Sequence, residues 1–334
     1  MKILSYVGKF LDQPRLVNGL NRSMPFILVG GAGVVIAKQT SESKNKAKTF
    51  TKETATLLGV VGSSLLAVKG LKVGKTQIFK GLIEGKKELI SNEVIDGFSK
   101  TVKDKEVKDI LEKAKTKMLA LGNIKKLMEH AKKNPEGQNF MDKFIPSPKD
   151  INSKEILGEI KRLSLIGLIP VLGGIAGGTL GDKLTSEKWK KKVPDKLKEG
   201  FYQYFANIFL CNVGAGAALA AVEILEAKKV IKASKATRAI AMTAGILGVG
   251  VFGGSAIANL IGQKVINPMF CKGKKHGKIY EERVPDALDI SLHVDDTASV
   301  GVLSGFKWVE PALPILYSVS GYRAGIGYRT KKDA

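Results

Sequence analysis

The residues that could carry out chemistry in this chain fall into a few short motifs. Residues 70–76 read GLKVGKT, residues 293–296 read HVDD, and Cys211 and Cys271 are the two thiols. A phosphate-binding loop needs four residues between its first glycine and the GK pair, so that consecutive amides surround the phosphates, and here there are three. His293 has no second histidine nearby for a metal, and neither cysteine has a histidine partner to activate it. These motifs therefore predict no enzyme, no metal site and no cofactor.

A second set of chemically capable residues consists of amides inside otherwise apolar segments: Asn207, Asn212, Asn259 and Gln263. Polar side chains at membrane depth must find partners or water, so they either join helices by hydrogen bonds or line a path for a solute. Asn207 and Asn212 are five residues apart, about 140° around an α-helix, and so are not expected to share a face.

The segments that must position these amides lack charge altogether. Five such windows occur, Met24–Ala37, Thr54–Val68, Leu163–Gly181, Gly200–Val222 and Ala239–Gln263. A hydrocarbon core of roughly 30 Å needs about 20 helical residues, which the last two windows exceed and the third nearly reaches. The first two extend only about 22 Å as helices, so they span with snorkelling flanks or are re-entrant. We predict an all-α, polytopic membrane protein, the alternative being buried hairpins in a soluble core.

Small residues recur at helical spacing within these windows. One stripe comprises Gly173, Gly177 and Gly181, with Gly174 and Gly178 beside it, and a second comprises Gly250, Gly254, Ala258 and Gly262. Residues four apart lie on one helix face, and small ones let two backbones approach closely. Because mid-helix glycines cost roughly 0.5–1 kcal/mol each against alanine in water, the stripes predict close helix packing, within the chain or between copies.

Charge in the remaining segments is strongly positive. The 334 residues include 54 Lys plus Arg against 31 Asp plus Glu, a net charge of +23, and every segment outside the windows is positive. Nucleic acid is not the expected partner, because no basic run is interleaved with stacking aromatics. We expect the bilayer itself and its anionic headgroups to be the partners, in a multi-pass protein of the bacterial inner membrane. Basic residues near the window ends divide equally between the two faces, so orientation stays undetermined.

The regions outside the windows divide the chain into four parts. Residues 1–68 hold an interfacial helix and two short apolar segments, with a mitochondrial targeting segment as the alternative for the first 20 residues. Residues 69–162 are expected to form a basic helical connector module outside the bilayer, with a capping box at Thr101 and Asp104 and a breaker-rich link over 134–150. Residues 163–263 form a three-helix membrane core, and residues 264–334 a tail with a re-entrant, interfacial or packed segment.

Two function classes follow from these features. The first is a non-enzymatic protein that organises or assembles in the membrane through glycine packing and basic, lipid-facing loops. The second is a transporter or channel for a small solute or ion, because short apolar segments interrupted by Gly and Pro resemble the broken helices around transport sites.

Overall fold

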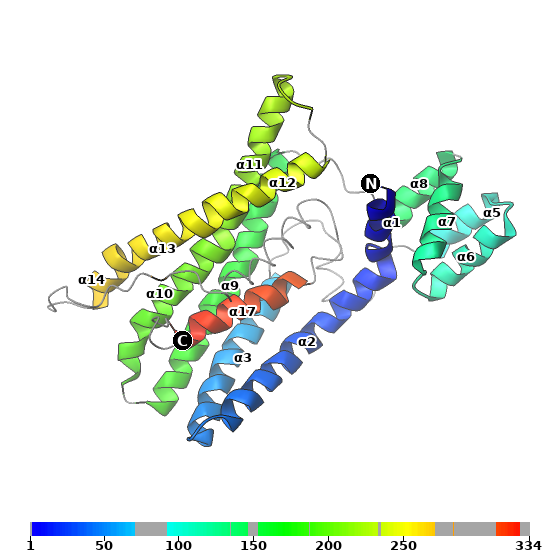
Figure 1. The fold of residues 1–334 in the computed structure, drawn as a ribbon. Coiled ribbons are helices and arrows are strands. Elements are labelled where there is room, and N and C mark those ends of the chain that lie inside the picture. The colour runs from blue at the N-terminus through cyan, green and yellow to red at the C-terminus, as the bar shows by residue number, and fades with distance from the viewer. Residues whose placement is uncertain are drawn as a thin grey trace.

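The computed structural model describes residues 2–70, 92–133, 135–145, 153–186, 188–232, 235–270, 283 and 312–327. In these residues every regular element is a helix (Figure 1), so the all-α prediction is confirmed for the described part of the chain. The helices of the N-terminal half are α1 (Lys2–Leu11), α2 (Pro14–Ser41), α3 (Lys46–Gly70), α5 (Asn92–Thr101), α6 (Lys105–Thr116), α7 (Leu121–Ala131) and α8 (Pro135–Phe144). Those of the C-terminal half are α9 (Ser153–Thr185), the 3₁₀ turn η1 (Trp189–Lys192), α10 (Val193–Tyr204), the π-helix η2 (Phe205–Phe209), α11 (Leu210–Ala227), α12 (Lys235–Gly245), the π-helix η3 (Ile246–Gly253), α13 (Gly254–Ile261), the π-helix η4 (Gly262–Ile266), α14 (Asn267–Phe270) and α17 (Leu313–Ile326).

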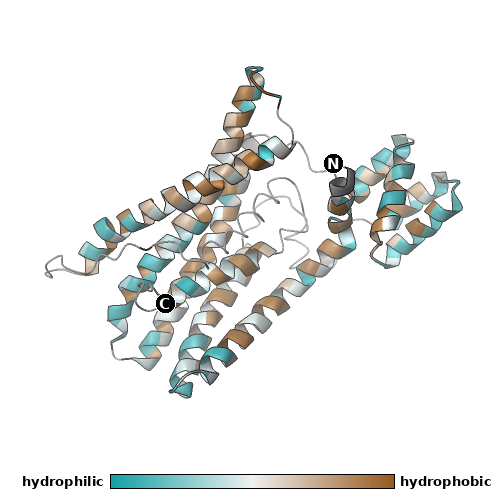
Figure 2. Cartoon of the chain, in the orientation of Figure 1, coloured by the Kyte–Doolittle hydropathy of each residue, from teal (hydrophilic) through white to brown (hydrophobic). Residues whose placement is uncertain are grey.

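Four helical stretches among the described residues are long and apolar enough to cross a membrane. They are Pro14–Ser41, Leu163–Thr185, Trp189–Ala227 and Ile240–Phe270. Figure 2 shows their apolar middle sections and the hydrophilic turns that join α2 to α3 and α9 to α10 at one end of the bundle.

The first two windows belong to helices much longer than the windows themselves. α2 has 28 residues and α3 has 25, which correspond to about 42 Å and about 37 Å. Both helices continue through flanking lysines, including Lys38, which is exposed, and Lys52, which lies 3.8 Å from Asp182. α2 also continues through Pro25. The 22 Å estimate applies to the uncharged windows only, and the helices that contain them are longer, because absence of charge marks the apolar section of a helix and not its ends.

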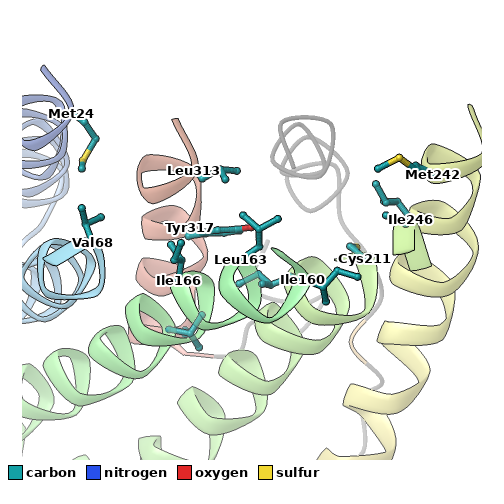
Figure 3. Packing of buried hydrophobic residues seen from close by; sticks show 14 of the residues in the cluster. Met24, Val68, Ile160, Leu163, Ile166, Cys211, Met242, Ile246, Leu313 and Tyr317 are labelled. Atoms are coloured by element: carbon teal, nitrogen blue, oxygen red, sulfur yellow. The ribbon is translucent and has the colours of Figure 1, made fainter. Parts of the chain in front are cut away.

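The bundle is built around α9. This helix packs against α3 along one side and α17 along another, while α11 packs against α12 and η3. Figure 3 shows Tyr317 of α17 beside Leu163 and Ile166 of α9, in a core to which α2, α3 and α11 also contribute. α17 is only 14 residues long, about 21 Å, and packs against α3, α9 and α10.

Helices α5 to α8 form a small module with its own core. Phe98 stacks on Phe140 with ring centroids 4.3 Å apart, and Phe140 stacks on Phe144. Asp104 caps α6 by accepting hydrogen bonds from the Glu106 and Val107 amides. The predicted capping box is wrong in one member, because Thr101 closes the preceding helix. The predicted link is also wrong over 135–144, where Pro135 starts helix α8 in the first-turn position that suits proline.

The module is attached to the start of α2. Gln13 donates a hydrogen bond to the Leu119 carbonyl at 3.1 Å and accepts one from the Leu119 amide at 2.8 Å. Arg15 donates to the Ala114 carbonyl, and Phe10 of α1 packs against the module core. The N-terminal helix, expected at a membrane interface, thus has protein contacts on this module.

Several sequence motifs lie outside the described residues. These are most of the GLKVGKT segment, the HVDD segment and Cys271.

Candidate functional site

The first stripe of α9 lies directly on α3. A Cβ added to Gly173 would come within 2.5 Å of the Gly59 carbonyl oxygen, and one on Gly177 within 3.0 Å of the Gly59 Cα. A Cβ on Gly181 would lie 2.8 Å from the Lys52 carbonyl oxygen. Only hydrogen fits at these positions, so the two helices touch backbone to backbone over about two turns.

The neighbouring stripe of α9 lies on α17. A Cβ on Gly174 would come within 1.8 Å of the Gly321 carbonyl oxygen, and one on Gly178 within 2.0 Å of the Gly325 carbonyl oxygen. One helix thus presents two adjacent glycine faces to two different partners. This arrangement explains why its glycines occur in pairs along the sequence.

The second stripe packs η3 and α13 against η2 and α11. A Cβ on Gly250 would meet the Cys211 Cα at 2.8 Å, and one on Gly254 the Ala206 Cα at 2.5 Å. Ala258 is buried, whereas a Cβ on Gly262 would meet nothing closer than Lys198 Cγ at 3.9 Å. The stripe is therefore tight over its first part and loosely packed at its last member, Gly262, which is buried.

The four-residue spacing that identifies the stripes does not identify one further close contact, that of Gly214 in α11 with Gly245 in α12. A Cβ on either residue would come within about 2.2 Å of the other's carbonyl oxygen. Gly245 precedes Gly250 by five residues, and the intervening π-helix η3 closes its turns over five residues rather than four. A search at four-residue spacing therefore passes over Gly245.

A row of buried polar side chains lies along α10 and η2. Gln203 donates to Glu199 Oε1 at 2.9 Å, and Asn207 donates to Gln203 Oε1 at 3.0 Å. All three side chains are at most 2% exposed, and the row extends about 12 Å along an otherwise apolar helix. We name these three residues the polar ladder.

Two arginines from distant segments hold the acidic end of the polar ladder. Arg283 Nε lies 3.2 Å from Glu199 Oε2, and Arg323 Nε of α17 lies 3.5 Å from Glu199 Oε1. The Arg283 guanidinium also lies over the Tyr202 ring, 4.6 Å from its centroid. A carboxylate buried this deeply needs such partners, because an unpaired charge in an apolar interior is very costly.

A second ion-pair cluster surrounds Asp182 near the end of α9. Lys196 Nζ lies 3.1 Å from Asp182 Oδ2, and Lys192 Nζ lies 3.2 Å from Asp182 Oδ1. Lys196 also donates to the Gly325 carbonyl, and Lys52 of α3 lies 3.8 Å from Asp182. The cluster therefore connects α3, α9, α10 and α17 just inside the turn between α9 and α10.

The other predicted polar residues are dispersed. Asn212 is buried and donates to the Ile208 carbonyl at 2.8 Å within its own helix. Asn259 exchanges hydrogen bonds with the backbone of Arg283, and Gln263 is half-buried in η4. Asn207 and Asn212 are both buried, because the five-residue turn of η2 brings residues five apart closer to one face than an α-helix does. Of the four predicted amides, Asn207 alone belongs to the polar ladder.

The charged residues of the site had no clear sequence signal. Glu199 and Lys196 lie just before an uncharged window, where the sequence predicts the solvated end of a helix. Their partners come from segments far along the chain, and Arg283 is separated from Glu199 by 84 positions. The four-residue spacing of Glu199, Gln203 and Asn207 was the one available clue, since such residues share a helix face.

Among the described residues, no cluster of three His, Cys, Asp or Glu side chains could hold a metal ion. The described arrangement contains close-packed glycine faces, buried ion pairs and a polar ladder. Comparison of the chain with protein-family models, curated proteins and solved structures found no match.

Proposed function

We propose that the chain is a non-enzymatic, multi-pass integral membrane protein that organises or assembles in the membrane, with the bacterial inner membrane as its location. The backbone contact of α9 with α3 and α17 carries this proposal. Helices in lipid gain little from burying apolar side chains against each other, so they associate through close packing of small residues.

The outer faces of the bundle support a lipid environment. Phe26 and Val34 of α2 are 79% and 68% exposed, and Ile240 and Phe252 in the α12 to α13 segment are 70% and 75% exposed. Large apolar residues gathered on long helices mark a surface that meets membrane or another protein. Because the glycine stripes are used inside one chain, association between copies would need one of these outer faces.

The basic turns support a role at anionic lipid. Lys38, Lys44, Lys46 and Lys48 surround the turn between α2 and α3, and Lys190 and Lys191 lie in the turn between α9 and α10. Lys190 Nζ lies over the Trp189 ring in that second turn, 5.7 Å from its centroid, a pairing of ring and cation that suits the headgroup region.

Alkaline carbonate extraction of membranes from cells expressing the full chain tests the membrane assignment. The protein is expected in the pellet after ultracentrifugation, and recovery in the supernatant would refute the proposal. The organising role is tested separately on an outer face of the bundle, by native gel analysis of the wild type and of Phe252→Ser, a position that is 75% exposed and outside the glycine contacts. The wild type is expected to migrate as an assembly of several copies and Phe252→Ser as a smaller species, whereas a wild type that migrates as a single copy would contradict the organising role.

Transport of a small solute or ion is the second candidate function, and the polar ladder favours it. Ionisable side chains inside a membrane bundle mark ion or solute pathways, and π-helices are frequent at functional sites. Flux of protons, Na⁺, K⁺ and chloride into vesicles containing the purified protein tests this candidate. A transport role predicts a flux that Asn207→Leu abolishes while the protein stays folded, and the absence of any flux with these ions favours the organising role.

A further inference from the structure

An open cleft lies between α2 and α3. Its volume is about 470 Å³, within the range of about 300–1,000 Å³ that small-molecule sites occupy. The lining includes Gly33, Ile36, Ala37, Thr40, Lys46 and Phe50. Its lining residues place the cleft next to the turn between the two helices. Figure 2 shows that this end of the hairpin is hydrophilic.

Polarity changes from one end of this cleft to the other. Gly33, Ile36 and Ala37 belong to the uncharged section of α2, whereas Thr40 and Lys46 flank the turn. An amphiphile at a membrane interface has the same order, with its hydrocarbon toward the bilayer centre and its polar group at the surface.

The polar end of the cleft contains groups that suit an anion. Lys46 is exposed and makes no ion pair within the described residues. Lys44 and Lys48 lie on either side of Lys46 and raise the local positive charge, against Glu42 as the acidic residue of the turn.

We propose that this cleft binds one anionic phospholipid, with its phosphate at Lys46 and an acyl chain along Gly33, Ala37 and Phe50. The inference rests on the proposed membrane location and adds a specific lipid site to it. Charge complementarity selects an anionic lipid over a zwitterionic one, because a headgroup with its own ammonium gains less from the lysines.

Native mass spectrometry of the full chain in detergent tests this site, with phosphatidylglycerol and phosphatidylcholine of the same acyl chains as probes. The wild type is expected to retain phosphatidylglycerol as a one-to-one adduct in preference to phosphatidylcholine. Lys46→Gln should weaken retention roughly fivefold, the loss of one lysine contact at a membrane surface. The matched control is Lys48→Gln, which removes the same charge two residues away and outside the cleft lining.

A second pair of variants tests the acyl-chain end. A Cβ on Gly33 or on Gly30 meets no atom within 4 Å, so both positions accept a larger side chain without disturbing the helix contacts. Gly33→Phe fills the cleft and should abolish the adduct, whereas Gly30→Phe lies outside the lining and should retain it.

Equal retention of the two lipids by the wild type, equal losses for Lys46→Gln and Lys48→Gln, or unchanged binding by Gly33→Phe would each overturn the site. The carbonate extraction described above separates this failure from failure of the membrane proposal. A protein that stays in the pellet but binds both lipids equally lacks the site and keeps its membrane location.

Discussion

Gly59 of α3 and Gly177 of α9 meet backbone to backbone. A Cβ on Gly59 would lie 2.9 Å from the Gly177 Cα, and a Cβ on Gly177 would lie 3.0 Å from the Gly59 Cα. Neither clash can be relieved by rotating a side chain, because the atoms in the way belong to the main chain. These two residues, with Gly173 and Gly181, thus set the separation of α3 and α9.

Gly177→Leu should therefore destabilise the protein, by about 1–3 kcal/mol or more, because the larger residue forces the helices apart. Thermal denaturation of the detergent-solubilised protein, followed by circular dichroism, measures the loss as a lower midpoint. Gly62→Leu is the control on α3, since a Cβ at Gly62 meets open space. Equal midpoints for the two variants would contradict the close packing of these helices.

A sharper version of the same comparison lies within η3. Gly250→Leu should destabilise strongly, because its Cβ would meet the Cys211 Cα at 2.8 Å. Gly248→Leu, two residues earlier in the same π-helix, should leave the denaturation midpoint nearly unchanged, because a Cβ there meets nothing within 4 Å. Thermal denaturation again gives the two midpoints. A larger fall in the midpoint for Gly248→Leu than for Gly250→Leu would mean that η3 packs against α11 through its opposite face.

Sequence patterns predicted the helical class and the presence of close-packed glycines, since both follow from local spacing. They did not predict the partner of each stripe. The choice between α3 and α17 for the two faces of α9 depends on a C-terminal helix that is distant in sequence. Helix ends were also missed, because Lys38 and Glu53 lie within helices although they bound the uncharged windows.

The polar ladder could be predicted only in part, for a related physical reason. Asn207 can be identified from the sequence because it is a polar residue in an apolar segment. The ion pairs of Glu199 with Arg283 and Arg323 form only in the folded chain, so the sequence does not predict them. The π turns likewise change residue spacing in response to packing, so a four-residue rule finds Gly250 and Gly254 and misses Gly245.

Replacing Glu199 with glutamine should leave two arginines without their shared carboxylate. Breaking a buried ion pair in this way costs about 3–5 kcal/mol, so the Glu199→Gln variant should unfold at a much lower denaturant concentration. Glu223→Gln is the control, because Glu223 is partly exposed and lies 3.8 Å from Arg238, an arrangement worth about 0–1 kcal/mol. Unfolding of both variants in mixed micelles, followed by tryptophan fluorescence, provides the measurement. Similar midpoints would show that Glu199 is solvated rather than clamped.

Phe98 provides a test of the helical module. Its ring is 7% exposed and stacks on Phe140 at a centroid distance of 4.3 Å, so Phe98→Ala should cost about 3–5 kcal/mol of module stability. Limited proteolysis of the full chain is expected to cut the variant between residues 92 and 145 much faster than the wild type. Met118→Ala should change little, because Met118 is 49% exposed. If the cuts in Phe98→Ala also spread to α2, the hydrogen bonds of Gln13 and Arg15 couple the module to the bundle. If they stay between residues 92 and 145, the module unfolds independently of it.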